Sequence, residues 1–405
     1  MSLIADRLKV IKPSPTLAVS ARAAKLKAEG RDVIAMGAGE PDFDTPQFIK
    51  DAAIAAMNKG FTKYTPAGGT ASLKKAIAAK FKRENGLDYT ERQILVSCGG
   101  KQTSFNLCMA LLNPGDEAII PAPYWVSYPD MAMMADGRPV FVFAGVEQGF
   151  KITPEQLERA ITPKSRLLWL NSPSNPTGAV YTAAELAALG AVLRKHPRVI
   201  IATDDMYEHI VLDGSKFVNI LNVCPDLYPQ TVTMNGVSKA YAMTGWRIGY
   251  CGGPAELIEA MENVQSHSTS NPSSISQYAA EAALSGDQSC IDPMLSAFKE
   301  RGKVVSEGLN RIPGVKCLPP AGAFYAFPDC REAIRKLHAA GKIASPTDLA
   351  LCDYLLAQPQ AVAAVPGSAF GAEGYLRISF ATSMDNIKKA VERMASAMAP
   401  ERVAA

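Results

Sequence analysis

Residues 93–112, QILVSCGGKQTSFNLCMALL, decide the fold class, because three successive elements can be distinguished in them. The apolar run at 94–97 predicts a short buried strand. The glycine pair Gly99–Gly100 predicts a tight turn, and the residues after it have the spacing of a helix. A strand that passes through a glycine turn into a helix is typical of α/β proteins.

The same alternation continues along the chain. Short apolar strands are predicted at 116–123, 166–173 and 198–205, and helices at 44–60, 68–85 and 183–196. This order predicts an α/β fold with a mostly parallel, doubly wound sheet flanked by helices. After about residue 300, a long helix and two candidate antiparallel strands (314–329 and 374–382) predict a smaller α+β domain.

Composition excludes several classes of protein. The chain has 405 residues, of which 48% are hydrophobic and 20% charged, and its net charge is +3. No basic run indicates nucleic acid, and no apolar run approaches the roughly 18–20 residues of a membrane span. The N-terminal segment MSLIADRLKVIKPSPT lacks the apolar core of a signal peptide.

Cysteine and histidine spacing argues against a metal site. The eight cysteines form no CxxC pair, and the four histidines are far apart in the sequence. Neither a zinc site nor a disulfide framework is expected from this pattern, and free thiols fit a reducing cytoplasm.

Polar clusters follow three of the predicted strands. They are GGKQ (99–102), NSPSNPTG (171–178) and TDDMYEH (203–209). In an open α/β sheet, ligands bind at the carboxyl ends of the strands. The three clusters are therefore expected to converge on one site.

Two cations stand in NGVSKAYAMTGWRIGY (235–250), a segment with no acidic residue. Lys239 and Arg247 must be solvated or must meet an anion, because a buried cation without a partner is costly. Lys239 is either a surface lysine or an amine with a depressed pKa that forms a Schiff base. Arg247 would then bind an anion such as phosphate.

The polar clusters add candidate ligand-binding residues, each with a plain structural alternative. Gly99 and Gly100 either form an ordinary turn or hold a phosphate at a helix N-terminus. Asp204 is a helix cap or the partner of a cationic ring, with Tyr207 about one helical turn away. Asn175 lies in strong turn sequence. Taken together, these residues fit one ligand with a phosphate, an aldehyde, a ring nitrogen and a phenolic oxygen, which is pyridoxal 5′-phosphate.

Seven motifs, in order over nearly the whole chain, then support a resemblance. The sequence resembles the class I, fold-type-I pyridoxal-phosphate-dependent aminotransferases, close to the bacterial aspartate and aspartate/prephenate aminotransferases. The motifs are AGEPDFDTP (38–46), KYTPAGG (63–69), APYWVSYP (122–129), NSPSNPTGAVY (171–181), NGVSKAYAMTGWRIGY (235–250), GAFY (322–325) and RISFATS (377–383).

The resemblance implies three domain segments. They are an N-terminal arm with part of the small domain (1–46), a large cofactor-binding domain (47–300) and a C-terminal small domain (301–405). It also implies a homodimer with shared active sites.

The resemblance implies the following cofactor contacts. Lys239 forms the Schiff base and moves the substrate proton, and Asp204 keeps the pyridine nitrogen protonated. The remaining contacts are Tyr207 and Asn175 at the ring hydroxyl, Trp125 on the ring face, Gly99, Gly100, Lys101 and Arg247 around the phosphate, and Tyr64 from the neighbouring subunit.

For the substrate, the resemblance implies that Arg377 binds the α-carboxylate beside Gly39, with Trp125 and Asn175 nearby. The arginine that reads the distal carboxylate in one branch of the family is absent from 266–276. Another branch uses a lysine in the glycine turn, where Lys101 stands, unless that residue is simply a solvated helix start.

Lys12 is a further candidate, since the resemblance links a lysine at this point to prephenate.

The expected activity is transamination between aspartate or glutamate and a 2-oxo acid, with prephenate as a further candidate. A pyridoxal-phosphate lyase and an aminotransferase of aromatic or neutral specificity are the alternatives within the same fold. A regulator with an aminotransferase-like sensor would carry a DNA-binding domain, for which a match beginning by about residue 12 is expected to leave no room. The expected partners are small amino and oxo acids, without nucleic acid, membrane or metal.

Overall fold

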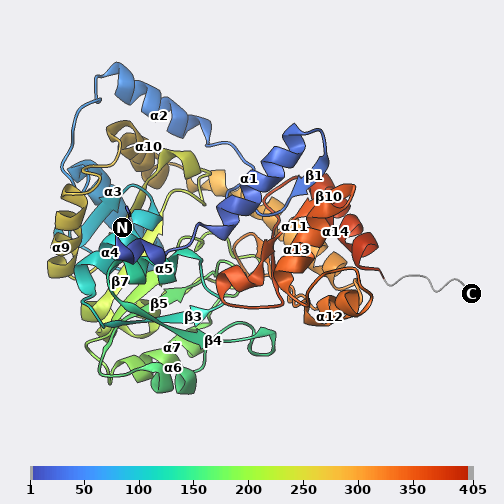
Figure 1. Cartoon of the computed structure of the whole chain (residues 1–405). Coiled ribbons are helices and arrows are strands. Elements are labelled where there is room, and N and C mark those ends of the chain that lie inside the picture. Colours follow the sequence, from blue (N-terminus) through green and yellow to red (C-terminus); the bar gives the residue numbers. More distant parts are fainter. Residues whose placement is uncertain (1–2, 400–405) are drawn as a thin grey trace, which may run out of the picture.

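This computed structural model describes residues 3–399, which form a larger and a smaller lobe (Figure 1). A seven-stranded sheet lies at the centre of the larger lobe. Its order is β2-β8-β7-β6-β5-β3-β4, and only β8 runs against the others. The strands are β2 (Ile94–Ser97), β3 (Glu117–Ala122), β4 (Arg138–Phe143), β5 (Ser165–Asn171), β6 (Ile200–Asp204), β7 (Thr231–Gly236) and β8 (Gly249–Gly252).

Successive side chains along each strand enter the cores on opposite faces of the sheet. On β5, Leu167 and Trp169 pack in one core, whereas Leu168 and Leu170 pack in the other. A strand buried on both faces explains why these segments are continuously apolar in sequence. Each fully buried leucine side chain contributes about 1.5–3 kcal/mol by leaving water.

Helices cover both faces of this sheet (Figure 1). One face is covered by α3 (Ala71–Lys80), α7 (Ala183–Leu193), α8 (Ile220–Val223) and α10 (Ser274–Ser285), with α2 (Gln47–Asn58) against α10. Helix α6 (Pro154–Ala160) lies beside α7 on this same face. The other face is covered by α4 (Gly100–Leu111), α5 (Ser127–Met134) and α9 (Ala255–Ser266).

Local sequence explains where several helices begin and end. A capping box between Thr182 and Glu185 starts α7. Gly99, with φ +88°, precedes α4. Helix α3 continues into a π-helical turn, Phe81–Asn85, which ends at Gly86 with φ +66°.

The smaller lobe joins the two ends of the chain. Strand β1 (Asp32–Ala35) pairs in parallel with β10 (Gln360–Ala363), and a separate antiparallel sheet has the order β11-β12-β9. Its other elements are α1 (Pro15–Ala28), α11 (Asp292–Leu309), β9 (Tyr325–Ala326), α12 (Arg331–Ala339), α13 (Asp348–Ala357), β11 (Val365–Pro366), β12 (Leu376–Ser379) and α14 (Met384–Met398). The predicted fold class, with a mostly parallel sheet and a smaller α+β unit, is confirmed.

The division at residues 46 and 300 stays a prediction. Its second boundary falls inside the continuous helix α11, and residues 1–2 and 400–405 lie outside the described part. Short 3-10 segments complete the described chain: Asp6–Lys9, Glu91–Gln93, Val146–Gln148, Pro225–Gln230, Thr244–Trp246, Gln288–Ile291 and Gly367–Phe370.

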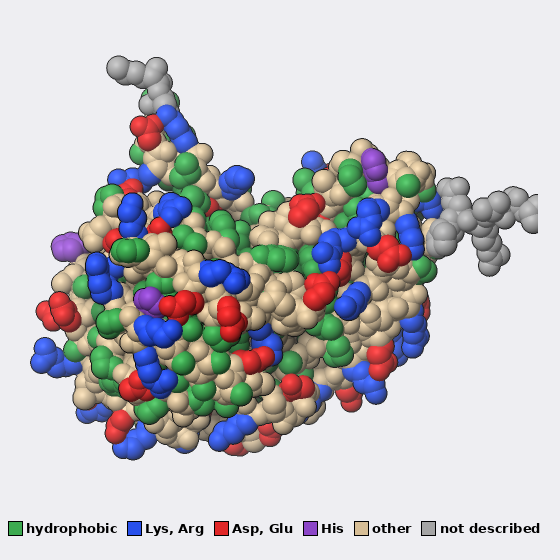
Figure 2. Space-filling view, turned by 90° about the horizontal axis from the view of Figure 1, so that it is seen from below, with side chains coloured by type: hydrophobic (Ala, Val, Ile, Leu, Met, Phe, Trp, Pro, Cys, Tyr) green, Lys and Arg blue, Asp and Glu red, His purple; other side chains and the backbone are tan. Residues whose placement is uncertain are grey.

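Surface charge is mixed in the view of Figure 2, where Lys and Arg side chains are interspersed with Asp and Glu. Between residues 3 and 399, no helix has both the length and the apolar character needed to cross a membrane.

Candidate active site

A cavity of about 500 Å³ lies at the carboxyl edge of the parallel strands, where residues of the smaller lobe also line it. The structure thus brings together residues after β2, β5, β6 and β7, as the three polar clusters predicted. The predicted residues that line the cavity are Gly39, Gly100, Lys101, Trp125, Asn175, Asp204, Tyr207, Lys239, Arg247 and Arg377.

Cations outnumber carboxylates in the lining of this cavity. Lys101, Lys239, Arg247 and Arg377 face it, whereas the lining carboxylates are Asp204 and Glu40. A cleft lined mainly by one sign of charge attracts ligands of the opposite sign. The cavity is therefore suited to anionic ligands.

Lys239 lies three residues beyond the end of β7, and its amine points into the cavity. Its Nζ donates a hydrogen bond to the carbonyl oxygen of Gly39 at 2.5 Å and lies 5.9 Å from the ring centroid of Tyr207. Burial, together with the charges of Arg377 and Arg247, lowers the pKa of the Lys239 amine to about 8. A larger neutral fraction near neutral pH makes this amine a better nucleophile than an exposed lysine.

Asp204 ends β6 and is held from two sides. The hydroxyl of Tyr128 donates to its Oδ2 at 2.6 Å, and Asn171 Nδ2 donates to its carbonyl oxygen at 2.9 Å. Burial raises the pKa of the Asp204 carboxyl, against the effect of the Tyr128 hydrogen bond. Tyr207 is buried, and its hydroxyl is hydrogen-bonded to that of Tyr325 at 2.9 Å.

The glycine turn before α4 makes room for the guanidinium of Arg247. A Cβ atom on Gly99 would lie 2.2 Å from a terminal nitrogen of Arg247, and one on Gly100 would lie 2.5 Å from Met206 Cε. Arg247 also donates to the carbonyl oxygen of Thr244 at 2.8 Å. A guanidinium beside the N-terminus of a helix is a favourable place for an anion such as phosphate.

Arg377 on β12 is buried, with 2% of its surface exposed. Its guanidinium donates to Asn175 Oδ1 at 3.0 Å and to the carbonyl oxygen of Gly37 at 2.8 Å, while its Nε has no hydrogen-bond partner among residues 3–399. It lies between the rings of Tyr325 and Phe370, 4.6 and 5.0 Å from their centroids. No carboxylate of the described chain forms an ion pair with Arg377. An anionic ligand bound in the cavity can therefore neutralise its charge.

Lys101 stands in the first turn of α4 and lies 5.1 Å from the ring centroid of Trp125. Desolvation and the nearby charge of Arg247 lower the pKa of its amine. Its charge acts, together with that of Lys12, on the half-buried carboxyl of Asp130.

Three predicted residues lie outside the lining of the cavity in the single chain: Lys12, Tyr64 and Gly99, of which Gly99 stands beside the lining residues Gly100 and Arg247. Lys12 is exposed and lies outside the lining, although its charge acts on Asp130. Tyr64 is also outside the lining and has 91% of its surface exposed.

Sequence reasoning missed Tyr128, Tyr325 and Asn171 as site residues. Each lies inside a motif already singled out: APYWVSYP, GAFY and NSPSNPTGAVY. The motifs carried a usable signal, because each of these side chains contacts a predicted site residue. Thr16 and Ser20 of α1 also line the cavity. Sequence reasoning missed them, because they lie in none of these motifs.

Comparison with known proteins gives consistent matches over nearly the whole chain. The family described as "Aminotransferase class I and II" matches residues 31–394. An aspartate/prephenate aminotransferase of Nitrosomonas europaea is 64% identical over 97% of this chain and 99% of its own length. A second one, from Cereibacter sphaeroides, is 54% identical over 97% and 98% of the two chains.

Solved structures agree with these sequence matches. The aspartate aminotransferase of Rhizobium meliloti superposes with a TM-score of 0.92 at 50% identity and covers 98% of this chain and 99% of its own. That of Thermus thermophilus, solved with maleate, has a TM-score of 0.91 at 42% identity and covers 98% and 100%.

Proposed function

Since the chain belongs to the class I and II aminotransferase family, as its motifs predicted, we propose that it transfers the amino group of aspartate or glutamate to a 2-oxo acid. We include prephenate among its acceptors, because two relatives more than 50% identical over nearly the whole chain are named aspartate/prephenate aminotransferases. The observation that carries the proposal is one cavity that holds the amine of Lys239 together with the guanidinium groups of Arg247 and Arg377.

We propose pyridoxal 5′-phosphate as the cofactor. The family implies it, and the residues present fit it, because the space beside Gly99 is filled by a guanidinium and the amine of Lys239 has a pKa of about 8. When bound, the cofactor supplies an electron sink for the pair of electrons left behind when an amino acid loses its α-proton. Arg247 and the first turn of α4 would hold its phosphate.

Asp204 and Tyr207 would face the ring of the cofactor. The Asp204 carboxylate would hold a proton on the ring nitrogen, and the Tyr128 hydroxyl orients that carboxylate. Tyr207 would donate to the ring hydroxyl oxygen, with Asn175 beside it and Trp125 against the ring face. These roles follow from the family resemblance and from the position of each side chain in the cavity lining.

Arg377 would bind the α-carboxylate of the substrate. Its guanidinium is fixed by Asn175 and Gly37, and its Nε has no partner within the described part of the chain, so the group is preorganised for an anion. Gly39, where a Cβ atom would lie 3.4 Å from the Tyr325 hydroxyl, would leave space for that carboxylate. Lys239, once free of the cofactor, would take the α-proton as a general base, because its lowered pKa keeps part of the amine neutral near pH 7–8.

We assign the distal carboxylate of acidic substrates to Lys101. The amine lines the same cavity, and the solved Thermus relative was crystallised with maleate, a dicarboxylate. Lys12 stays an alternative, as an exposed residue that acts with Lys101 on Asp130.

We propose that the enzyme is a homodimer. Tyr64 is 91% exposed, which suits a residue that completes the neighbour's site. Apolar side chains are also exposed on and after α2, including Ile54, Met57 and Phe61, and a second copy of this chain would cover them. We further propose a cytoplasmic location, in keeping with the eight cysteines, which are all described and all free.

A two-substrate assay tests the proposed activity. The purified enzyme is loaded with pyridoxal 5′-phosphate and given aspartate with either 2-oxoglutarate or prephenate. We expect an amino product from each acceptor and no sustained turnover when the acceptor is omitted. Keto-acid formation that continues without an acceptor would instead identify a lyase, and activity confined to aromatic or neutral amino acids would reject the acidic specificity.

A further inference from the structure

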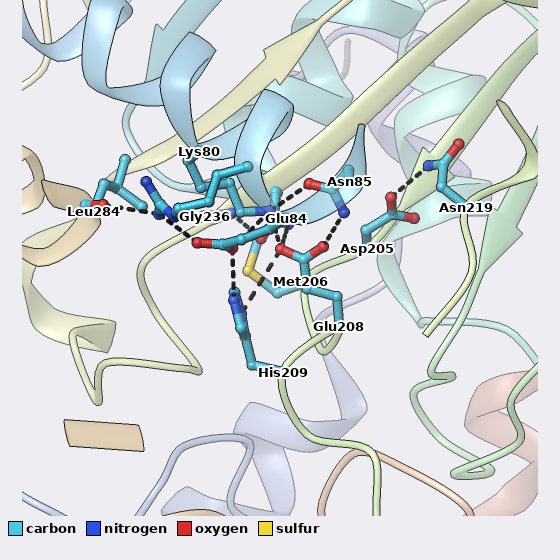
Figure 3. A network of polar contacts seen from close by, with 12 residues as sticks. Lys80, Glu84, Asn85, Asp205, Met206, Glu208, His209, Asn219, Gly236 and Leu284 are labelled. Carbon is cyan, nitrogen blue, oxygen red and sulfur yellow. Dashed lines mark hydrogen bonds and ion pairs between the residues drawn. The ribbon is translucent and has the colours of Figure 1, made fainter. Parts of the chain in front are cut away.

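Behind the loop that follows β6 lies a cluster of charged and amide side chains that the proposed chemistry does not use (Figure 3). Asp204 at the end of β6 and Tyr207 in this loop line the cavity, whereas Asp205 and Glu208 do not. Glu208 has 7% of its surface exposed, and Lys80 at the end of α3 has none. A buried charge pair is costly to desolvate, so its presence here requires an explanation.

Glu208 is bound by three side chains from three different parts of the fold. Its Oε1 forms an ion pair with the Lys80 ammonium and accepts a hydrogen bond from Asn235 Nδ2 at 2.7 Å. Its Oε2 accepts from Asn85 Nδ2 at 2.6 Å, and Lys80 in turn donates to Asn85 Oδ1 at 2.8 Å. The loop after β6 is thereby fixed to α3, to the π-helical turn and to β7.

An outer carboxylate completes the cluster. Glu84 lies 3.5 Å from the Lys80 ammonium and accepts a hydrogen bond from His209 Nε2 at 2.9 Å. Burial disfavours the Glu84 carboxylate, but His209 and Lys80 outweigh this effect and lower its pKa to about 2. Donor atoms of Glu84, Glu208 and His209 are close enough to hold a metal ion, but the Lys80 ammonium already supplies the positive charge between the two carboxylates.

The cluster also reaches the strand that leads to Lys239. Asn235, which binds Glu208, is the penultimate residue of β7 and stands four residues before Lys239. Its Oδ1 accepts from the amide of Gly236 at 2.7 Å, and a Cβ atom on Gly236 would lie only 3.0 Å from Met206 Cε. The segments that carry Asp204, Tyr207 and Lys239 thus meet around one buried carboxylate.

We infer that Glu208 and Lys80 are positioning residues, which hold the end of β6, the loop that carries Tyr207 and the end of β7 in the positions that the cofactor requires. The inference rests on the proposed function, because the held side chains are those assigned to the cofactor. When side chains that contact a ligand shift by a small distance, binding and catalysis weaken even though each of these side chains is still present. Glu208 and Lys80 themselves need not touch cofactor or substrate.

The test compares Glu208→Gln and Lys80→Met with Lys75→Met, a matched control on the exposed side of the same helix. Five quantities are measured for each: melting temperature of the cofactor-free protein, Kd for pyridoxal 5′-phosphate, the pH midpoint of the visible absorbance of the loaded enzyme, and kcat and KM for aspartate. For Glu208→Gln, which keeps the side-chain shape, we expect a Kd increase and a kcat decrease of about 10-fold or more, since hydrogen bonds to a charged group are lost. The midpoint should move by at least about 0.5 pH units, with KM nearly unchanged, whereas Lys75→Met should match the wild type.

A purely structural role gives a different result. If Glu208→Gln and Lys80→Met lower only the melting temperature, and leave Kd, midpoint and kcat at wild-type values, the inference is overturned. Should Lys80→Met fail to fold, the decision passes to Glu208→Gln and to Asn235→Ala, which removes one hydrogen bond to Glu208 and no charge. Failure of the wild-type protein to bind the cofactor would reject the proposed function, whereas normal binding by the wild type and by all variants would reject only the positioning role.

Discussion

Replacing Lys101 with methionine should change which amino acids the enzyme accepts. The substitution keeps most of the aliphatic length of the side chain and removes the charged Nζ, which lies 5.1 Å from the ring centroid of Trp125. Arg377 is assigned to the α-carboxylate, a group that every amino acid carries, so it would not distinguish aspartate from alanine. Discrimination needs a second cation, and Lys101 is the lysine, besides Lys239, that lines the cavity.

The size of the effect follows from the contact that is lost. A hydrogen bond between an ammonium and a carboxylate contributes about 1.5–3 kcal/mol, and about 1.4 kcal/mol corresponds to a factor of ten. Lys101→Met should therefore lower kcat/KM for aspartate by about 10- to 100-fold. Aromatic and aliphatic amino acids carry no distal charge, so their kcat/KM should stay nearly constant.

The preference for aspartate should also depend on pH. Desolvation and Arg247 lower the pKa of the Lys101 amine, so the ammonium is lost at lower pH than in an exposed lysine. Preference for aspartate over a neutral amino acid should consequently weaken as pH rises toward that range. In Lys101→Met this part of the pH dependence should disappear.

The assay is steady-state kinetics with a fixed acceptor, on the wild type, Lys101→Met, Lys12→Met and an exposed control, Lys164→Met, which stands at the opposite edge of the sheet before β5. Equal losses for aspartate and for neutral amino acids in Lys101→Met would refute the reasoning, because they would mean that the lysine serves the phosphate or the helix. A selective loss of aspartate or prephenate in Lys12→Met alone would transfer the role to that residue.

Four further predictions concern the cofactor and the dimer. In the cofactor-free protein, Lys239 should react with an amine reagent in a pH-dependent way with a midpoint near the pKa of about 8, and a midpoint near that of exposed lysines would contradict its desolvation. Asp204→Ala should lower kcat by at least about 10²-fold, and near-normal turnover would reduce this residue to a helix cap. Arg377→Lys should raise KM for every amino acid by about 10-fold or more, since one ammonium cannot replace the two parallel hydrogen bonds that a guanidinium donates to a carboxylate. An unchanged KM would argue against Arg377 as the residue that binds the α-carboxylate. Tyr64→Phe should weaken cofactor binding in a protein that sediments as a dimer, and a fully active monomer at assay concentration would exclude a shared site.

The convergence of the residues proposed to bind the cofactor could be predicted, because local sequence marks them. Parallel strands bring their carboxyl ends to one edge, so the clusters that contain Gly100, Asn175 and Asp204 had to converge once the strands were recognised. Gly99 could be predicted as a turn residue, but only the structure shows that a Cβ atom there would lie 2.2 Å from Arg247.

The buried cluster behind the site could not be predicted in the same way. Lys80 and Glu208 are 128 residues apart, and in sequence each resembles the solvated charge of an ordinary helix or loop. Their burial depends on how α3 packs against the loop after β6, which periodicity does not specify. The division at residue 300 stays a prediction, and that position lies inside the continuous helix α11.

The central claim, transamination through Lys239, is tested most directly by a single turnover without an acceptor. The loaded enzyme is mixed with excess aspartate while the visible absorbance and the released 2-oxo acid are followed. We predict one absorbance change, one equivalent of 2-oxo acid per active site and then no further reaction, until added 2-oxoglutarate restores the starting spectrum; Lys239→Ala should release none. Continued release of 2-oxo acid without an acceptor, or a full turnover by Lys239→Ala, would contradict the account.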